Sequence, residues 1–138
     1  MTFNEFRSFV EGKMETDWTV TPIEFQNVSE SAALIAAKDA KTPWIRLTIV
    51  NGDGSQITIG SPSKCDRYAG NIIVQIFTGQ KIGTKTGLVL ADSVSVIWNG
   101  FTGEADVEIR TPSMNVIGEL QGWFQINVTI PFLNDEIS

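Results

Sequence analysis

The feature that most constrains this chain is an alternating stretch at residues 123–132, which reads WFQINVTIPF. Apolar and polar side chains alternate there, and side chains two residues apart on a strand point to the same face. Residues Tyr68–Thr78, which carry AGNIIVQIF, predict a second strand, with Ile72, Val74 and Ile76 on one face. The two stretches predict a sheet with one face buried and the other in contact with water.

Two other stretches have the spacing of helices. Thr2 and Glu5 match a capping box and predict a helix over residues 3–15, and Asn99-Gly100 ends a second predicted helix over 84–98. Their apolar stripes are expected to pack on the sheet. These stripes are Phe3, Phe6, Phe9, Val10 and Met14 in the first helix, and Leu90, Ala91, Val94, Ile97 and Trp98 in the second.

The segment Ser29–Lys41 is alanine-rich and begins with serines that can cap a helix. It predicts either a short helix or a loop that becomes helical on contact, and it is interpreted as a helical arm or an insertion.

Shorter strands are expected in the remaining segments. Trp18–Phe25 predicts an edge strand, because Pro22 cannot donate a hydrogen bond to a neighbouring strand. Residues 44–60 predict a β-hairpin that turns at Asn51–Gly54. Further strands are expected at 104–110 and 113–118, followed after residue 132 by a polar tail, Leu133–Ser138.

These elements predict one α+β domain that spans residues 1–138. The sheet is expected to be mostly antiparallel or mixed, with two main helices packed on one of its faces.

Composition narrows the chemistry that this chain can perform. The sequence contains no histidine and one cysteine, Cys65, so it has no Ser-His-Asp or Cys-His site, no histidine- or all-cysteine zinc site and no internal disulfide. Its net charge of −6 argues against nucleic-acid binding. We therefore expect no enzyme activity and no cofactor. We also expect a protein made in a cytoplasm, since no signal peptide or membrane span is evident.

Three carboxylates, Glu104, Asp106 and Glu108, follow one another at period two, so they are expected on one strand face. Such spacing suits a hard cation or a glycosidase-like acid pair, which keeps a small carboxylate-dependent hydrolase or lyase as an alternative. The favoured interpretation is an acidic strip that faces water or a pore.

The predicted helix 84–98 carries Val89 and Val96 away from its main apolar stripe, and only Lys85 and Asp92 in it are charged. A surface helix of a monomer usually has a clearly polar face. The second side of this helix is therefore either covered by loops or a subunit interface formed by Lys85, Val89, Asp92 and Val96.

The order of these elements and several phrases resemble one protein family. The phrases are TPIEFQNV, PWIRLTIVNGDGSQITIGS, NIIVQIF, GTKTGLVLADSVSVIWNG and GWFQINVTIPFLNDE. Together they resemble the tail terminator (tail completion) proteins of long-tailed bacteriophages, which are related to the minor tail protein of lambda-like phages. The segment Ser29–Lys41 departs from that family, in which a shorter loop is expected.

The resemblance implies a homohexameric ring on the head-proximal end of a phage tail, assembled in the host cytoplasm and kept in the virion. Such a ring ends polymerisation of the major tail tube protein and offers a surface to the head completion or connector protein. Genomic DNA passes through its channel without specific binding. Glu104, Asp106 and Glu108 would line part of that channel and repel DNA phosphates. A head–tail connector or neck protein of the same fold stays open as an alternative.

Overall fold

The computed structural model describes residues 1–57 and 65–137, which form three helices and six strands. In chain order these are α1 (Phe3–Asp17), β1 (Ile23–Glu24), α2 (Ala32–Ala40), β2 (Trp44–Gln56), β3 (Cys65–Thr78), α3 (Lys85–Trp98), β4 (Val107–Ile109), β5 (Ser113–Leu120) and β6 (Trp123–Ile137). The α+β class predicted from the sequence is confirmed.

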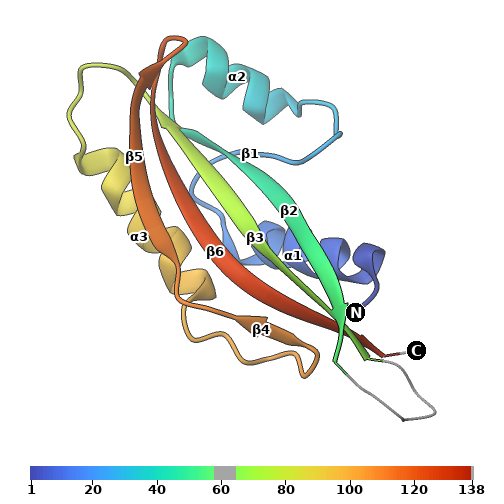
Figure 1. Ribbon diagram of the computed structural model, residues 1–138. Helices are drawn as coiled ribbons and strands as arrows, with labels where there is room; N and C mark the ends of the chain where they lie inside the picture. The colour runs from blue at the N-terminus through green and yellow to red at the C-terminus, as the bar shows by residue number, and fades with distance from the viewer. Residues whose placement is uncertain (58–64, 138) are drawn as a thin grey trace.

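The six strands form one sheet in the order β1-β2-β3-β6-β4, and β5 also pairs with β6. Only β1 and β2 run parallel to each other, and the other described pairs are antiparallel. β3 pairs with β6 from residue 124 to residue 137, so β4 and β5 lie one after the other along the opposite side of β6. Figure 1 shows the long strands β2, β3 and β6 crossing the molecule side by side, with β5 along the edge.

Helices α1 and α3 cover one face of the sheet, as predicted, and form the main core with it (Figure 1), although Phe3 of the predicted stripe is 53% exposed. The capping box of Thr2 and Glu5 is present at the start of α1. Trp98 joins the two helices, since its indole Nε1 donates to Met14 Sδ at 3.2 Å. The fully buried sheet residues of this core alternate along three strands: Ile45 and Leu47 on β2, Ile72, Val74 and Ile76 on β3, and Ile126, Val128 and Ile130 on β6.

Helix α2 covers one end of the other face. Its buried residues Leu34 and Ala37 pack with Trp44, Phe77 and Trp123 in a second, smaller cluster. The helix begins at the cap Ser31, whose Oγ accepts from the Leu34 N–H, and it ends at Lys41 in the left-handed conformation. The segment expected as an arm or an insertion is thus a helix packed against the sheet.

The prediction of a β-hairpin over residues 44–60 is wrong, because the chain does not turn at Asn51–Gly54. Strand β2 continues through Asn51–Gly54 with a bulge, and its antiparallel partner is β3. Glycine is needed here because β2 and β3 approach each other closely, not because the chain turns: a Cβ at Gly52 would lie 2.2 Å from the Ala69 carbonyl oxygen. Residues 58–60 of the prediction lie outside the described residues.

The predicted polar tail Leu133–Ser138 is also wrong, because β6 continues to Ile137 and pairs with the first residues of β3. Its polar side chains find partners there. Asn134 is buried and exchanges hydrogen bonds with Met1, and Asp135 accepts two hydrogen bonds from Arg67. Ser138 lies outside the described residues.

Candidate interaction surfaces

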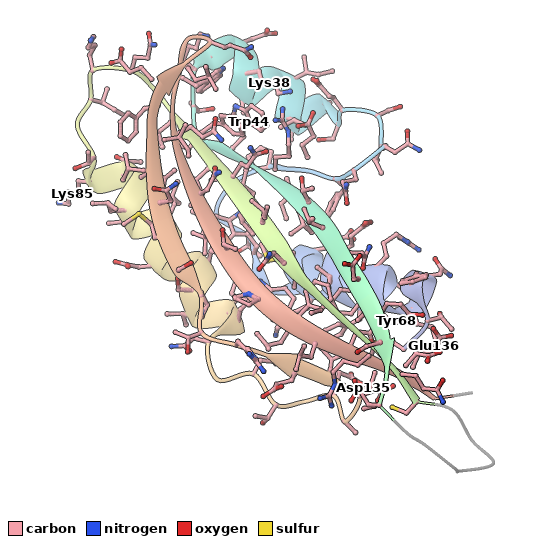
Figure 2. All side chains as sticks on the ribbon, in the orientation of Figure 1. Lys38, Trp44, Tyr68, Lys85, Asp135 and Glu136 are labelled. Carbon is pink, nitrogen blue, oxygen red and sulfur yellow. The ribbon has the colours of Figure 1, made fainter. Side chains whose placement is uncertain are left out.

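The outer face of α3 is exposed to solvent along the whole helix. Lys85, Val89, Asp92 and Val96 lie there, opposite the buried residues Gly87, Leu90, Ala91, Val94 and Trp98. The helix sits close to the sheet because a Cβ at Gly87 would lie 2.6 Å from Ile126 Cδ1. Val96 is 79% exposed, more than the other large apolar side chains that the structure describes. Figure 2 shows Lys85 projecting from the helix away from the sheet.

The three carboxylates expected on one strand face do not share a strand. β4 begins at Val107, so only Glu108 lies in it, exposed between the buried Val107 and Ile109. Asp106 instead forms an ion pair of 3.0 Å with the Met1 ammonium group. The predicted strand over 104–110 shrinks to Val107–Ile109, because residues 105 and 106 form a turn, although the Asp106 carbonyl still accepts from the Asp135 N–H of β6 at 2.8 Å.

The sheet has an open edge at β5, which the sequence analysis did not identify as a surface. β5 pairs with β6 on one side only, and most of its residues are exposed. Four large apolar side chains on it, Met114, Val116, Ile117 and Leu120, are each 44–51% exposed. The sequence signal was present, because residues 113–118 carry no charge. Uncharged exposed edge strands present unpaired N–H and C=O groups to other chains.

The opposite edge, on β2, is covered along its first half. β1 pairs with Ile45 and Arg46, and the Ile45 N–H donates to the Pro22 carbonyl at 3.1 Å. Further along, the Ile49 N–H donates to the side chain of Gln26 at 3.0 Å. This edge strand was predicted from Pro22, although β1 covers only two residues of the predicted stretch.

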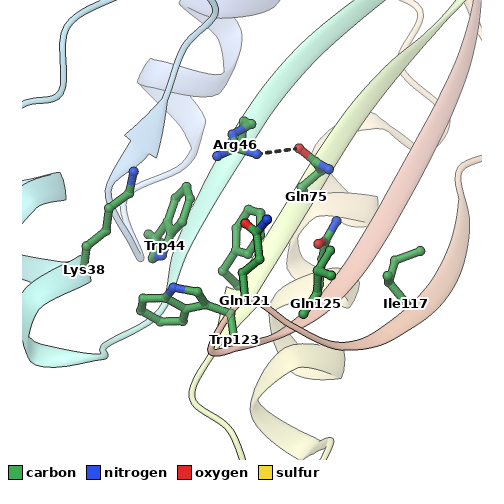
Figure 3. Close-up of a pocket in the computed structure, with 10 residues that line it drawn as sticks. Lys38, Trp44, Arg46, Gln75, Ile117, Gln121, Trp123 and Gln125 are labelled. Atoms are coloured by element: carbon green, nitrogen blue, oxygen red, sulfur yellow. Dashed lines mark hydrogen bonds between the residues drawn. The ribbon is translucent and has the colours of Figure 1, made fainter.

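A pocket of about 380 Å³ opens on the second face of the sheet, next to α2 (Figure 3). Its base is aromatic: the rings of Trp44 and Phe77 stack at 4.2 Å, and Trp123 meets Trp44 edge-on at 5.9 Å. Lys38 and Arg46 lie over the Trp44 ring, at 4.3 Å and 5.4 Å from its centroid. The buried indole Nε1 of Trp44 has no acceptor among the described residues, which costs about 1–3 kcal/mol.

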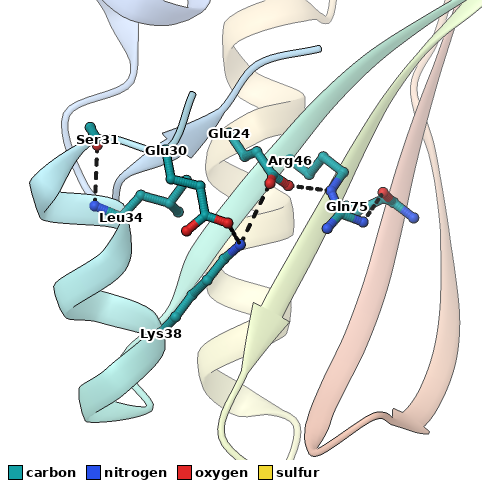
Figure 4. A network of polar contacts seen from close by, with 7 residues as sticks. All are labelled: Glu24, Glu30, Ser31, Leu34, Lys38, Arg46 and Gln75. Carbon is teal, nitrogen blue, oxygen red and sulfur yellow. Dashed lines mark hydrogen bonds and ion pairs between the residues drawn. The ribbon is translucent and has the colours of Figure 1, made fainter. Parts of the chain in front are cut away.

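The cations of this pocket are already paired (Figure 4). Glu24 accepts from Arg46 and from Lys38, and Glu30 lies 2.9 Å from Lys38. Burial of Glu24 opposes its ionisation, but hydrogen bonding and attraction to Arg46 outweigh burial. The pKa of Glu24 therefore lies below its ordinary value of 4.5. The network ties β1, α2 and β2 together, and two acids neutralise two bases within it.

A second ion pair holds the far end of the sheet. Arg67 on β3 donates from Nε and from Nη2 to the two carboxylate oxygens of Asp135 on β6, at 2.8 Å and 3.0 Å. These hydrogen bonds lower the pKa of Asp135 from its ordinary value of 3.8. Figure 2 shows Asp135, Glu136 and Tyr68 together at this end, where β2, β3 and β6 extend past the core.

The described residues contain neither a membrane-spanning helix nor a cluster of metal-binding side chains. No helix among residues 1–57 and 65–137 is long and apolar enough to cross a membrane. The same residues contain no group of three or more cysteine, aspartate or glutamate side chains arranged to hold a metal ion.

We found no family model and no curated protein that matches this sequence. Seventeen chains among the solved structures match it in fold. One of them is 11% identical to this chain, and the match covers 94% of this chain and 95% of the other, with a TM-score of 0.61. At this identity the likeness concerns the fold alone.

Proposed function

We propose that this chain is a structural protein that assembles with copies of itself into a ring, and that the ring caps the head-proximal end of a phage tail tube. The resemblance of its phrases to tail terminator proteins supports this function. The observation that carries the proposal is the exposed outer face of α3, where Val89 and Val96 are 52% and 79% exposed. Apolar side chains of this size, grouped on one helix, are typical of a surface that another chain covers.

A closed ring needs one patch on each copy to meet a different patch on the next. The outer face of α3 provides one such patch, with Lys85 and Asp92 beside the two valines. The ring works by contact and shape, so it needs no cofactor and performs no catalysis.

The charge of the chain suits a channel for DNA. Each copy carries −6, and a channel through six copies repels phosphate groups and lets DNA slide. Of the three proposed channel acids, Asp106 is engaged by Met1, Glu104 is half-buried, and Glu108 is exposed with the exposed Arg110 guanidinium 3.8 Å away. Glu108 is therefore the strongest candidate for the channel wall. The ring contacts the major tail tube protein on one side and the head completion or connector protein on the other, and it belongs to the virion.

The ring is tested by light scattering and electron microscopy of the purified protein, alone and on the ends of tail tubes. We expect rings of six copies, and we expect Val96→Glu to abolish them while the circular dichroism spectrum stays unchanged. Thr86→Glu is the matched control, because it adds the same charge to an exposed position on another side of α3. A chain that stays monomeric on tube ends contradicts the proposal.

The terminator role is tested by polymerising the major tail tube protein with and without this chain. We expect tubes to stop growing once the chain is added, and Val96→Glu to leave their growth unchecked. Rings that form but leave the growth of the tubes unchanged contradict the terminator role.

A further inference from the structure

We propose that β5 of one copy pairs with the second half of β2, Asn51–Ser55, on the next copy, so that neighbouring sheets join edge to edge. This inference rests on the proposed ring and specifies how its subunits meet. It assigns a surface on which the sequence analysis made no prediction.

β5 has the properties of a strand that is paired in the assembled state. Residues 113–118 carry neither a charge nor a proline, which are two of the devices that usually protect a free edge. The protection that β5 does have is a bulge between Val116 and Gly118, and the ion pair of Glu119 with Lys81 near its end. Four half-exposed apolar side chains lie along it, and a second strand placed against it would cover parts of them on both faces.

The second half of β2 offers the matching edge. The cover from β1 and Gln26 ends at Ile49, and Asn51–Ser55 is exposed. Asn51, Gly54 and Ser55 pair with β3 on the inner side, and the bulge lies between Asn51 and Gly54. Asp53 is the only charge in this segment, and it meets no carboxylate on residues 113–118.

Strand directions also agree with this contact. β5 is antiparallel to β6, β6 to β3, and β3 to β2, so β5 and β2 of one copy run in opposite directions. A neighbour that is rotated about an axis along the strands keeps these directions. Its β2 therefore meets β5 as an antiparallel strand, which is the commoner and more stable pairing.

Charge favours a second copy as the occupant. A copy carries −6, so self-association requires a surface poor in carboxylates, and residues 113–118 of β5 carry none, although Glu119 follows them and pairs with Lys81 at 3.0 Å. Five residues of strand measure about 17 Å, and a sheet with its helix layer stands about 20 Å high, which gives about 340 Å². A stable interface needs about 800 Å² per partner, so the strand pairing supplies one part of the subunit contact and the outer face of α3 supplies another.

Cysteine cross-linking tests the pairing directly. In a Cys65→Ser background, Asn115→Cys is combined in turn with Asn51→Cys, Asp53→Cys and Ser55→Cys, which samples the register. Oxidation of assembled protein should link copies into a ladder of up to six in at least one combination, since a disulfide needs Cα atoms within about 7 Å.

The single variants separate this proposal from its alternatives. Asn115→Cys alone should give no cross-link, and dimers from it would show that β5 pairs with β5 and would overturn the proposal. Rings that form without a cross-link in any combination overturn the strand pairing but leave the proposed function standing. A chain that stays monomeric on tube ends overturns both.

A charge placed on the edge gives a second, independent test. Ile117→Lys should lower the assembled fraction at least tenfold, because an edge lysine blocks pairing with another strand. Ile35→Lys is the matched control: it changes the same residue type at similar exposure, 47% against 44%, but lies on α2. Equal loss of assembly in both variants, or in neither, contradicts the inference.

Discussion

The two edges of the sheet differ in how far their backbone is covered by other parts of the chain. Along the first half of β2, the strand β1, the Gln26 side chain and the Glu24–Arg46 ion pair cover the backbone. Among the described residues β5 has no strand partner other than β6, and its side chains are uncharged over residues 113–118. The proposed contact between copies uses the uncovered backbone, along β5 and the second half of β2. The predictions below test this difference, from the largest effect to the smallest.

Side-chain truncation should affect the two edges very differently. Ile45→Ala removes a fully buried side chain at the covered edge and should lower the free energy of unfolding by about 3 kcal/mol. Val116→Ala at the open edge should lower it by less than about 0.5 kcal/mol in the monomer, because that side chain is half-exposed. Urea denaturation at low protein concentration measures both. Similar losses would mean that the open edge is already packed.

The bulge in β2 marks where the covered half of this edge ends. Gly52→Ala should cost about 2 kcal/mol, because the new Cβ would meet the Ala69 carbonyl oxygen. Gly12→Ala is the control: it has open space on α1 and should stabilise the protein by about 0.5–1 kcal/mol. Thermal unfolding compares the two. If Gly52→Ala left the stability unchanged, the close approach to Ala69 would be contradicted, and the predicted turn at Asn51–Gly54 would fit better.

Glu24→Gln should cost about 1 kcal/mol at neutral pH, because Arg46 loses its charged partner and Lys38 keeps only Glu30. The pKa of Glu24 is lower in the folded protein than its ordinary 4.5, so its contribution is complete above about pH 4.5 and is lost as pH falls through the folded value. The difference between the original and the variant should therefore shrink in acid. Glu15→Gln, at an exposed position on α1, should show no such difference.

The smallest effect is expected at Gln26, whose side chain accepts one hydrogen bond from the Ile49 backbone. Gln26→Ala should cost about 0.5 kcal/mol and should speed amide exchange at Ile49 severalfold. The Ile45 amide serves as the internal reference, since it donates to Pro22 and should be unchanged. Unchanged exchange at Ile49 would show that β1 alone covers this edge.

Sequence periodicity predicted the parts of this fold where burial is one-sided. Ile126, Val128 and Ile130 alternate with polar residues because only one face of β6 is covered by helices. The same rule failed at 133–136, where a buried position holds the polar Asn134, which is bonded to Met1, and Asp135 is paired with Arg67. There, binary patterning carries no information about strand formation.

The remaining errors came from features that a sequence does not show by itself. The Asn51–Gly54 motif has the composition of a turn, but in the structure Gly52 allows β2 to lie close to the Ala69 backbone of β3. The valines of α3 were identified as candidates because a surface helix should be polar, and the structure places them in solvent. Their role in assembly stays a prediction, as does that of the acids near β4.

The two cores separate the four tryptophans of this chain into equal pairs. Trp18 and Trp98 lie in the main core, whereas Trp44 and Trp123 lie in the cluster under α2. Intrinsic fluorescence therefore reports on two layers at once. Because the α2 cluster is small and includes an unsatisfied indole, it should open first in denaturant, with a red shift in about half of the emission before the main core responds.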